Sequence, residues 1–381
     1  MRRIIFWAHL IAGFIIGAFV FIMAATGVLL TYEAQILESY ESHTVDAEAS
    51  GSPVMPLDTL ALGARERFPY AGSIALELRP EESTVVKVLQ GRRTLGYLDP
   101  YTGEDVDIGI DGAKSFFGIV EDVHRWLAQT GDARGPAKSL MGAANLAFLI
   151  MILTGAYLWL PKVWQTAMLK RRLWLDTRPN SRKALFWNWH HVFGIWTVIP
   201  LVLITSSALV FSYGWASNLV YYAAGDAPPG NARPAAEPAP TLPDGASIMP
   251  LSEIAEGLGT QNPGWLKLQL VLPESEVAAQ MEATVYVGGW GTPMDRTKFK
   301  INRSSGLIEA SEPFSQMAPG RRARIFVRYL HTGEAFGIVG QTLFGLASLL
   351  AALLVVSGLY LGTGRLYRLV RKRRELSLES G

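Results

Sequence analysis

The sequence predicts an α-helical integral membrane protein with four transmembrane helices and two α+β domains outside the membrane. Charged residues make up only 18% of the 381 residues, and the mean hydropathy is +0.20. A soluble protein carries about 25% charged residues. Four long stretches contain no Asp, Glu, Lys or Arg. The two long connections contain the alternating pattern of half-buried strands, so both a membrane part and a sheet-containing part are expected.

The four charge-free stretches cover residues 4–32, 139–160, 186–213 and 335–363. Each is long enough to cross about 30 Å of hydrocarbon as a helix, and a helix is expected because lipid cannot satisfy exposed backbone groups. The first stretch follows two arginines, as a signal peptide does, but its apolar run is about twice as long as a signal core. We therefore expect retained transmembrane helices at residues 1–32, 139–160, 186–213 and 335–363.

The charge of the short segments predicts the orientation. The N-terminus, the loop at 161–185 and the tail at 364–381 hold 15 of the 35 Lys and Arg residues but only 3 of the 33 Asp and Glu residues. Basic segments next to spans remain in the cytoplasm. Both termini are thus expected to be cytoplasmic, and the connections at 33–138 and 214–334 are expected outside, where the remaining charges sum to −10.

Each of the two long connections is large enough for a small domain. The first contains the alternating segments SIALEL at 73–78 and TVVKV at 84–88, which indicate strands. The second begins with a Pro-, Ala- and Gly-rich stretch at 226–243, typical of a flexible linker.

The chain also shows an internal repeat of the unit span–domain–span. At an offset of 181, the first stretch matches the third through His9 and His190, Gly13 and Gly194, Thr26-Gly27 and Ser207-Ala208, and Tyr32 and Tyr213. At an offset of 203, the turns at 99–103 and 302–306 match, as do Thr154-Gly155 and Ser357-Gly358. A parallel repeat of this kind predicts a pseudo-twofold axis along the membrane normal.

Histidines are the candidate ligands, because the chain has no cysteine and therefore no thiolate metal site or covalently attached haem. His9 and His190 each lie 23 residues before a tyrosine, which places both about 35 Å from it along a helix. Two histidines at one depth, each followed four residues later by glycine, suit a flat macrocycle held between helices. The pattern predicts bis-histidine haem near the cytoplasmic side, with the adjacent His191 as an alternative to His190.

A second pair, His124 and His331, comes just before the second and fourth stretches, on the outer side. Arg125 follows the first of these histidines, and Arg328 precedes the second by about one helical turn. Arginines so placed suit bidentate binding of haem propionates. The offset of 207 between the two histidines requires a four-residue insertion in the repeat. The sixth histidine, His43, has no counterpart and is expected to be a surface residue.

Four motifs resemble those of the PepSY-associated transmembrane proteins: FWAHLIAG at 6–13, VHRWLAQTG at 123–131, WNWHHVFG at 187–194 and LHTGEAFG at 330–337. The resemblance extends over nearly the whole chain. It implies four spans, two periplasmic PepSY-like domains, two non-covalent b-type haems and a place in the bacterial inner membrane. It also implies reduction of ferric siderophores, with His124 and His331 as outer ligands and His9 with His190 or His191 as inner ligands.

No phosphate-binding loop, dinucleotide fingerprint, nucleophile elbow or zincin motif is present in the sequence. A one-electron reductase needs none of them, but it needs a separate electron donor, namely a quinol, a reduced flavin or a redox protein. Two other functions stay open at this point. One is a membrane-anchored module that binds peptides or regulates a protease, and the other is a quinol-oxidising cytochrome b.

Overall fold

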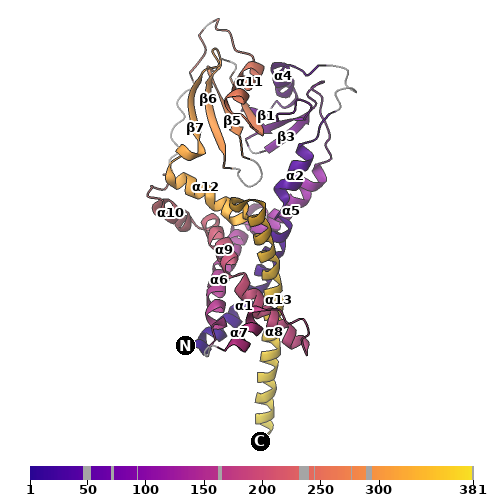
Figure 1. The fold of residues 1–381 in the computed structure, drawn as a ribbon, viewed down its shortest axis with the longest axis vertical. Helices are drawn as coiled ribbons and strands as arrows, with labels where there is room; N and C mark the ends of the chain where they lie inside the picture. Colours follow the sequence, from indigo (N-terminus) through magenta and orange to yellow (C-terminus); the bar gives the residue numbers. More distant parts are fainter. Residues whose placement is uncertain are drawn as a thin grey trace. The chain divides into compact units, whose positions relative to one another are not determined.

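A computed structural model describes residues 1–45, 53–69, 73–91, 93–161, 165–230, 240–243, 245–275, 277–288 and 294–379. The chain folds into two compact units (Figure 1). The helical unit comprises residues 1–33, 115–220 and 326–381, and the sheet unit comprises residues 34–114 and 221–325. Half of the predicted linker at 226–243, residues 231–239, lies outside the described residues.

The helical unit contains the apolar helices of the chain. They are α1 (Arg2–Leu29), α6 (Arg134–Trp159), α8 (Arg182–Trp196), α9 (Val198–Ser212) and α13 (Gly337–Glu379), with the short α7 (Thr166–Leu173) before α8. Among the described residues, three helices are long and apolar enough to cross a membrane, and α8 with α9 forms a fourth span if the bent pair counts as one. The chain is therefore a multi-pass membrane protein.

The third predicted span is broken in two. We expected one helix over 186–213, but α8 and α9 meet at Thr197 with a bend of 65°. Pro200 explains the break, because it has no N–H to donate to the carbonyl of Trp196 and its ring clashes with that carbonyl. Thr197 closes α8 by donating its backbone N–H and its hydroxyl to the Phe193 carbonyl, at 3.1 and 2.7 Å.

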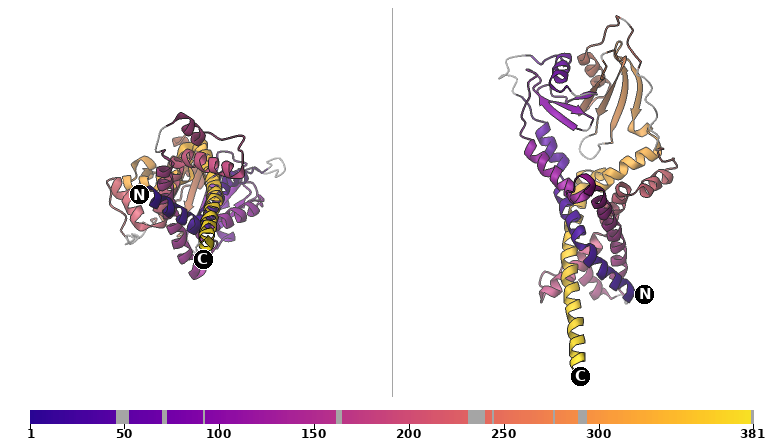
Figure 2. Two further views of the ribbon diagram at one scale, coloured as in Figure 1. Left: turned by 90° about the horizontal axis from the view of Figure 1, so that it is seen from below. Right: turned by 180° about the vertical axis from the view of Figure 1, so that it is seen from behind.

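Small residues allow the helices of the bundle to approach closely. Ala24 of α1 packs with Ala347 and Ala351 of α13 in a cluster that also includes Ile152 and Leu201. Lipid gives helices no hydrophobic reason to associate, so close packing and hydrogen bonds across helices hold such a bundle. The buried amide of Asn145 in α6 provides one such hydrogen bond, since it donates to the Thr205 carbonyl of α9 at 2.9 Å. The view from behind in Figure 2 also shows α1 (indigo) beside α13 (yellow).

Four helices cross the boundary between the units: α2 (Glu33–Glu41), α5 (Asp111–Trp126), α10 (Gly214–Ala223) and α12 (Pro319–Thr332). Short 3-10 turns lie after α5 at Gly131–Ala133, before α12 at Phe314–Gln316 and after α12 at Glu334–Phe336. Two of these helices, α5 and α12, end within two residues of a predicted ligand, His124 or His331. The two predicted outer histidines thus have corresponding positions in the chain.

The sheet unit holds one antiparallel sheet in the order β3-β2-β1-β4-β5-β6-β7. Its strands are β1 (Ile74–Leu78), β2 (Val86–Gln90), β3 (Arg93–Leu98), β4 (Lys267–Leu272), β5 (Gln280–Tyr286), β6 (Arg296–Asn302) and β7 (Ile308–Pro313). The strands predicted at 73–78 and 84–88 are β1 and the start of β2. The two connections do not form separate domains as expected, because β1 pairs with β4 through five residues on each strand.

A single hydrophobic core explains why the two halves join. Leu76 of β1 and Leu270 of β4 are fully buried and lie opposite each other in the pairing. The same core includes α4 (Leu57–Arg67) and α11 (Leu251–Gln261), one helix from each half. Pairing β1 with β4 leaves neither strand with an exposed edge of unpaired backbone groups.

The two halves of the sheet unit use matching turns. Asp99 and Asn302 each accept two backbone N–H groups in the turn, and the glycine four residues later donates to the same residue's carbonyl at 2.9 Å. Gly103 has φ +69° and Gly306 has φ +67°, a conformation that glycine adopts without steric cost. Methionines from the segments before α4 and α11 pack on these glycines.

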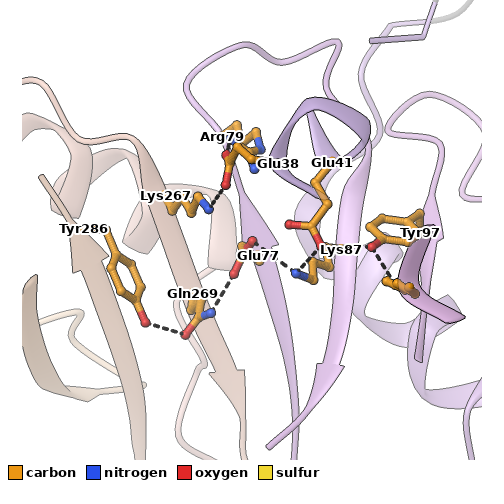
Figure 3. A network of polar contacts seen from close by, with 10 residues as sticks. Glu38, Glu41, Glu77, Arg79, Lys87, Tyr97, Lys267, Gln269 and Tyr286 are labelled. Carbon is orange, nitrogen blue, oxygen red and sulfur yellow. Dashed lines mark hydrogen bonds and ion pairs between the residues drawn. The ribbon is translucent and has the colours of Figure 1, made fainter. Parts of the chain in front are cut away.

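The sheet face away from α4 and α11 carries a polar network (Figure 3). Glu77, at 6% exposure, lies 3.9 Å from Lys87 and accepts a 2.6 Å hydrogen bond from Gln269 of β4. Lys87 also pairs with Glu41 at 2.6 Å, and Tyr97 donates to the same carboxylate. Burial and the neighbouring Glu41 raise the pKa of the Tyr97 hydroxyl above its usual value. The buried charges of this face are therefore paired, as burial requires.

Candidate cofactor-binding site

The predicted histidine ligands all lie in the helical unit, and the structure brings them together as two pairs. His9 of α1 and His190 of α8 line one cavity, and His124 of α5 interacts electrostatically with His331 of α12. The sixth histidine, His43, is exposed in the sheet unit. The pairing within the helical unit is the one expected from the repeat.

Each histidine of the first pair contacts a hydroxyl and a glycine of a neighbouring helix. His9 Nδ1 lies 3.1 Å from Thr154 Oγ1 of α6, and His190 Nδ1 lies 3.1 Å from Ser357 Oγ of α13. A Cβ atom at Gly155 would lie 3.2 Å from His9 Cε1, and one at Gly358 would lie 3.1 Å from His190 Cε1. A side chain in place of either glycine would therefore crowd the histidine ring beside it.

The second pair repeats this arrangement. His124 Nδ1 lies 2.8 Å from Thr26 Oγ1 of α1, and His331 Nδ1 lies 3.2 Å from Ser207 Oγ of α9. Gly27 follows the threonine and leaves 3.7 Å to His124 Cε1 for a Cβ atom. Burial lowers the pKa of His124 to about 4 and lowers the pKa of His331 as well. Both imidazoles are then neutral at pH 7, which is the form that binds a metal ion.

His191, the alternative to His190, has different contacts. Its Nδ1 donates to the Trp187 carbonyl of its own helix at 2.8 Å, and its ring stacks on the Trp187 indole with centroids 4.0 Å apart. Both histidines line the cavity. Within the described part of the chain, His190 has a hydroxyl partner on another helix, as His9 does, and His191 has none.

The cavity beside His9 and His190 has a volume of about 1340 Å³. Pockets for drug-sized ligands occupy about 300–1,000 Å³, so this one accommodates a larger group. Glycines from four helices lie along its walls: Gly13 and Gly17 of α1, Gly155 of α6, Gly194 of α8, and Gly358, Gly362 and Gly364 of α13. Two histidines from different helices, glycine walls and this volume fit a flat macrocycle such as haem.

Basic side chains line the same cavity: Arg2, Arg3, Lys183, Arg365, Arg368 and Lys372. Haem carries two propionates, and guanidinium and ammonium groups bind carboxylates through charge-assisted hydrogen bonds. Arg2 donates to the carbonyls of Leu158 and Leu160 at 2.6 and 2.5 Å. Arg365 lies over the Phe6 ring at 4.5 Å. The charge of the cavity wall thus also fits haem.

The two arginines predicted to bind propionates near the outer pair already have other contacts. Arg125 forms an ion pair with Glu121 at 2.5 Å, and its guanidinium lies 4.4 Å from the Trp126 ring centroid. Arg134 lies over the same ring at 3.9 Å. Arg328 is exposed and interacts electrostatically with Glu33. Both predicted arginines lie within a helical turn of a histidine, but each has an acidic neighbour.

Sequence reasoning missed two groups of residues in the site. The first is the set of hydroxyls, Thr26, Thr154, Ser207 and Ser357, which we had noted only as matching positions of the repeat. The second is the basic lining of the cavity, whose members we had used only to predict orientation. In both cases the signal was visible in the sequence, but the contact joins residues of different helices, and no spacing along the chain predicts it.

Comparisons with known proteins identify the family. No protein in the curated set that was searched matches the chain. A family model described as the PepSY-associated TM region matches residues 6–365, which is nearly the whole length and includes all four duplicated histidines. The chain therefore belongs to the family of PepSY-associated transmembrane proteins.

Proposed function

We propose that this protein is a di-haem b oxidoreductase of the bacterial inner membrane, which reduces ferric siderophores of the hydroxamate type in the periplasm and releases Fe(II). The observation that carries the proposal is the equivalence of the two histidine pairs. Each histidine contacts a Thr or Ser hydroxyl of a neighbouring helix, and one pair faces a cavity of about 1340 Å³. Peptide binding alone would not explain four histidines in this arrangement.

The residues that would hold the cofactors follow from the geometry. His9 and His190 would ligate one haem, with the basic cavity wall binding its propionates, and His124 and His331 would ligate the other. Bound haem b with two histidine ligands supplies one-electron transfer. Neither haem would be covalently attached, because the chain contains no cysteine.

A siderophore substrate is supported by its chemistry and by the charge of the chain. Hydroxamate oxygens are hard donors that bind Fe(III) very tightly, and one electron converts it to Fe(II), which they bind far more weakly. The residues outside the spans and short basic segments have a net charge of −10, which favours the approach of neutral or cationic complexes over anionic catecholates. The histidine motifs are also similar to those of FoxB, a siderophore reductase of the bacterial inner membrane.

The electron must come from a separate donor, because the sequence contains no nicotinamide- or flavin-binding motif. We propose a quinol, a reduced flavin or a redox protein.

Anaerobic mixing tests the siderophore as substrate. We expect protein reduced with dithionite, and freed of excess dithionite, to be reoxidised by a ferric hydroxamate, with Fe(II) captured by a chromogenic chelator in equal amount. The gallium complex of the same siderophore is the control, since Ga(III) is not reduced. Reoxidation by quinone together with none by any ferric siderophore would replace this proposal with the quinol-linked cytochrome.

Reporter fusions test the orientation. We expect alkaline phosphatase fused after Tyr32 or Tyr213 to be active, which indicates the periplasm. We expect green fluorescent protein fused at Arg172 to fluoresce, which indicates the cytoplasm, since basic segments stay inside. Alkaline phosphatase and green fluorescent protein at the same sites give opposite readouts and serve as controls for each other. A cytoplasmic signal at Tyr32 would contradict the model with both termini inside.

A further inference from the structure

The four hydroxyls beside the histidines share one hydrogen-bonding pattern. Each hydroxyl lies within 3.1 Å of the carbonyl three or four residues earlier in its own helix, to which it donates its hydrogen: Thr26 to Ile22, Thr154 to Ile150, Ser207 to Leu203 and Ser357 to Leu354. A hydroxyl has one hydrogen. Its oxygen therefore acts as an acceptor toward the histidine.

A backbone carbonyl supports the same assignment directly at His331. His331 Nδ1 lies 3.0 Å from the carbonyl of Ile204, three residues before Ser207. The equivalent carbonyls, three residues before the other hydroxyls, interact with the other histidines: Met23 with His124, Met151 with His9 and Leu354 with His190. A carbonyl oxygen only accepts hydrogen bonds, so Nδ1 of His331 carries the hydrogen.

We infer that Thr26, Thr154, Ser207 and Ser357 are positioning residues that fix the Nδ1–H tautomer of the four histidines and set the reduction potentials of the haems they ligate. A neutral imidazole protonated at Nδ1 presents the lone pair of Nε2, the atom that binds iron. This inference rests on the proposed haem binding. It gives a role to the paired Thr26-Gly27, Thr154-Gly155, Ser207-Ala208 and Ser357-Gly358, whose small second residue leaves room for the ring.

The hydrogen bond affects the potential through the basicity of the ligand. An acceptor on Nδ1–H draws the proton away from the ring and makes Nε2 a stronger donor to iron. A stronger donor stabilises Fe(III) more than Fe(II), and therefore lowers the reduction potential. Removal of a hydroxyl should accordingly raise the potential of the haem on that side of the membrane and leave the other haem unchanged.

Two matched substitutions test the inference by spectroelectrochemical titration of the purified full-length protein. In Ser207→Ala we expect a more positive potential for one of the two haems, whereas Ser206→Ala should leave both potentials unchanged. Ser206 is the neighbour in the same helix, and its hydroxyl bonds the carbonyls of Val202 and Leu203. For the other pair, Thr154→Val should raise the reduction potential of the other haem, whereas Thr154→Ser, which keeps the hydroxyl, should leave that potential at the wild-type value.

Several results would overturn the inference. They are unchanged potentials in both Ser207→Ala and Thr154→Val, an equal shift of both haems in one variant, or the same shift in Ser206→Ala as in Ser207→Ala. If Thr154→Val fails to fold, the comparison of Ser207→Ala with Ser206→Ala in α9 still tests the inference. A wild-type protein that binds no haem would instead refute the proposed function, so the two failures are distinguishable.

Discussion

Alanine at either histidine of a pair should remove one haem and leave the other in place. We expect His9→Ala and His190→Ala to lose the same haem, and His124→Ala and His331→Ala to lose the other, because one imidazole does not maintain a six-coordinate low-spin iron. The measurement is the haem content by pyridine haemochrome, together with the reduced-minus-oxidised spectrum. Each variant should retain roughly half of the α-band absorbance per protein chain, since one of two bis-histidine centres is left.

Two further alanine variants sharpen this test. His43→Ala is the control, because this histidine is exposed in the sheet unit and should have no effect on either haem. His191→Ala should also retain both, since His190 is the counterpart of His9 in the repeat and has the matching hydroxyl partner on another helix. Loss of a haem in His191→Ala with full retention in His190→Ala would show that His191 is the ligand. Two intact haems in every single variant would refute the pairing itself.

The candidate site could be predicted from the sequence in part, and the repeat is the reason. His9 and His190 match at the offset of the repeat, whereas His43 has no counterpart. Chance seldom places a histidine at the same position in both copies of a repeat, so the repeat distinguishes candidate ligands from an ordinary surface histidine. The hydroxyl partners were not predictable in the same way. His9 lies on α1 and Thr154 on α6, and the distance along the chain between residues of two packed helices follows no period.

The fold shows the same limit. The absence of charge predicted each membrane helix, and the alternating segments predicted β1 and β2, since both are properties of a local stretch. The joining of two expected domains into one sheet depends on β1 pairing with β4, and pairing between distant strands leaves no local signal. The bend at Thr197 is different, because Pro200 was visible within the stretch and its effect on a helix is known.

Valine at Gly155 should displace His9 and remove the haem that His9 and His190 ligate. A Cβ atom at this position would already lie 3.2 Å from His9 Cε1, and the two further methyl groups of valine would meet the ring. Overpacking of this kind costs about 1–3 kcal/mol, and displacement of the ring would disturb its contact with Thr154. We expect the haem content to fall from two to one per chain, and Gly358→Val to do the same through His190.

The matched control is Gly135→Val in the same helix, where a Cβ atom would meet nothing within 4 Å. Valine has a higher helix propensity than glycine, by a few tenths of a kcal/mol, so Gly155→Val does not weaken α6 itself, whereas Gly135→Val adds some strain in the first turn because Pro136 follows. A loss in Gly155→Val with two haems in Gly135→Val therefore measures the space beside the His9 ring. Two haems per chain in both Gly155→Val and Gly358→Val would contradict the described orientation of the histidines as ligands. An equal loss of haem in Gly135→Val would instead indicate that substitution anywhere in α6 disturbs the helix.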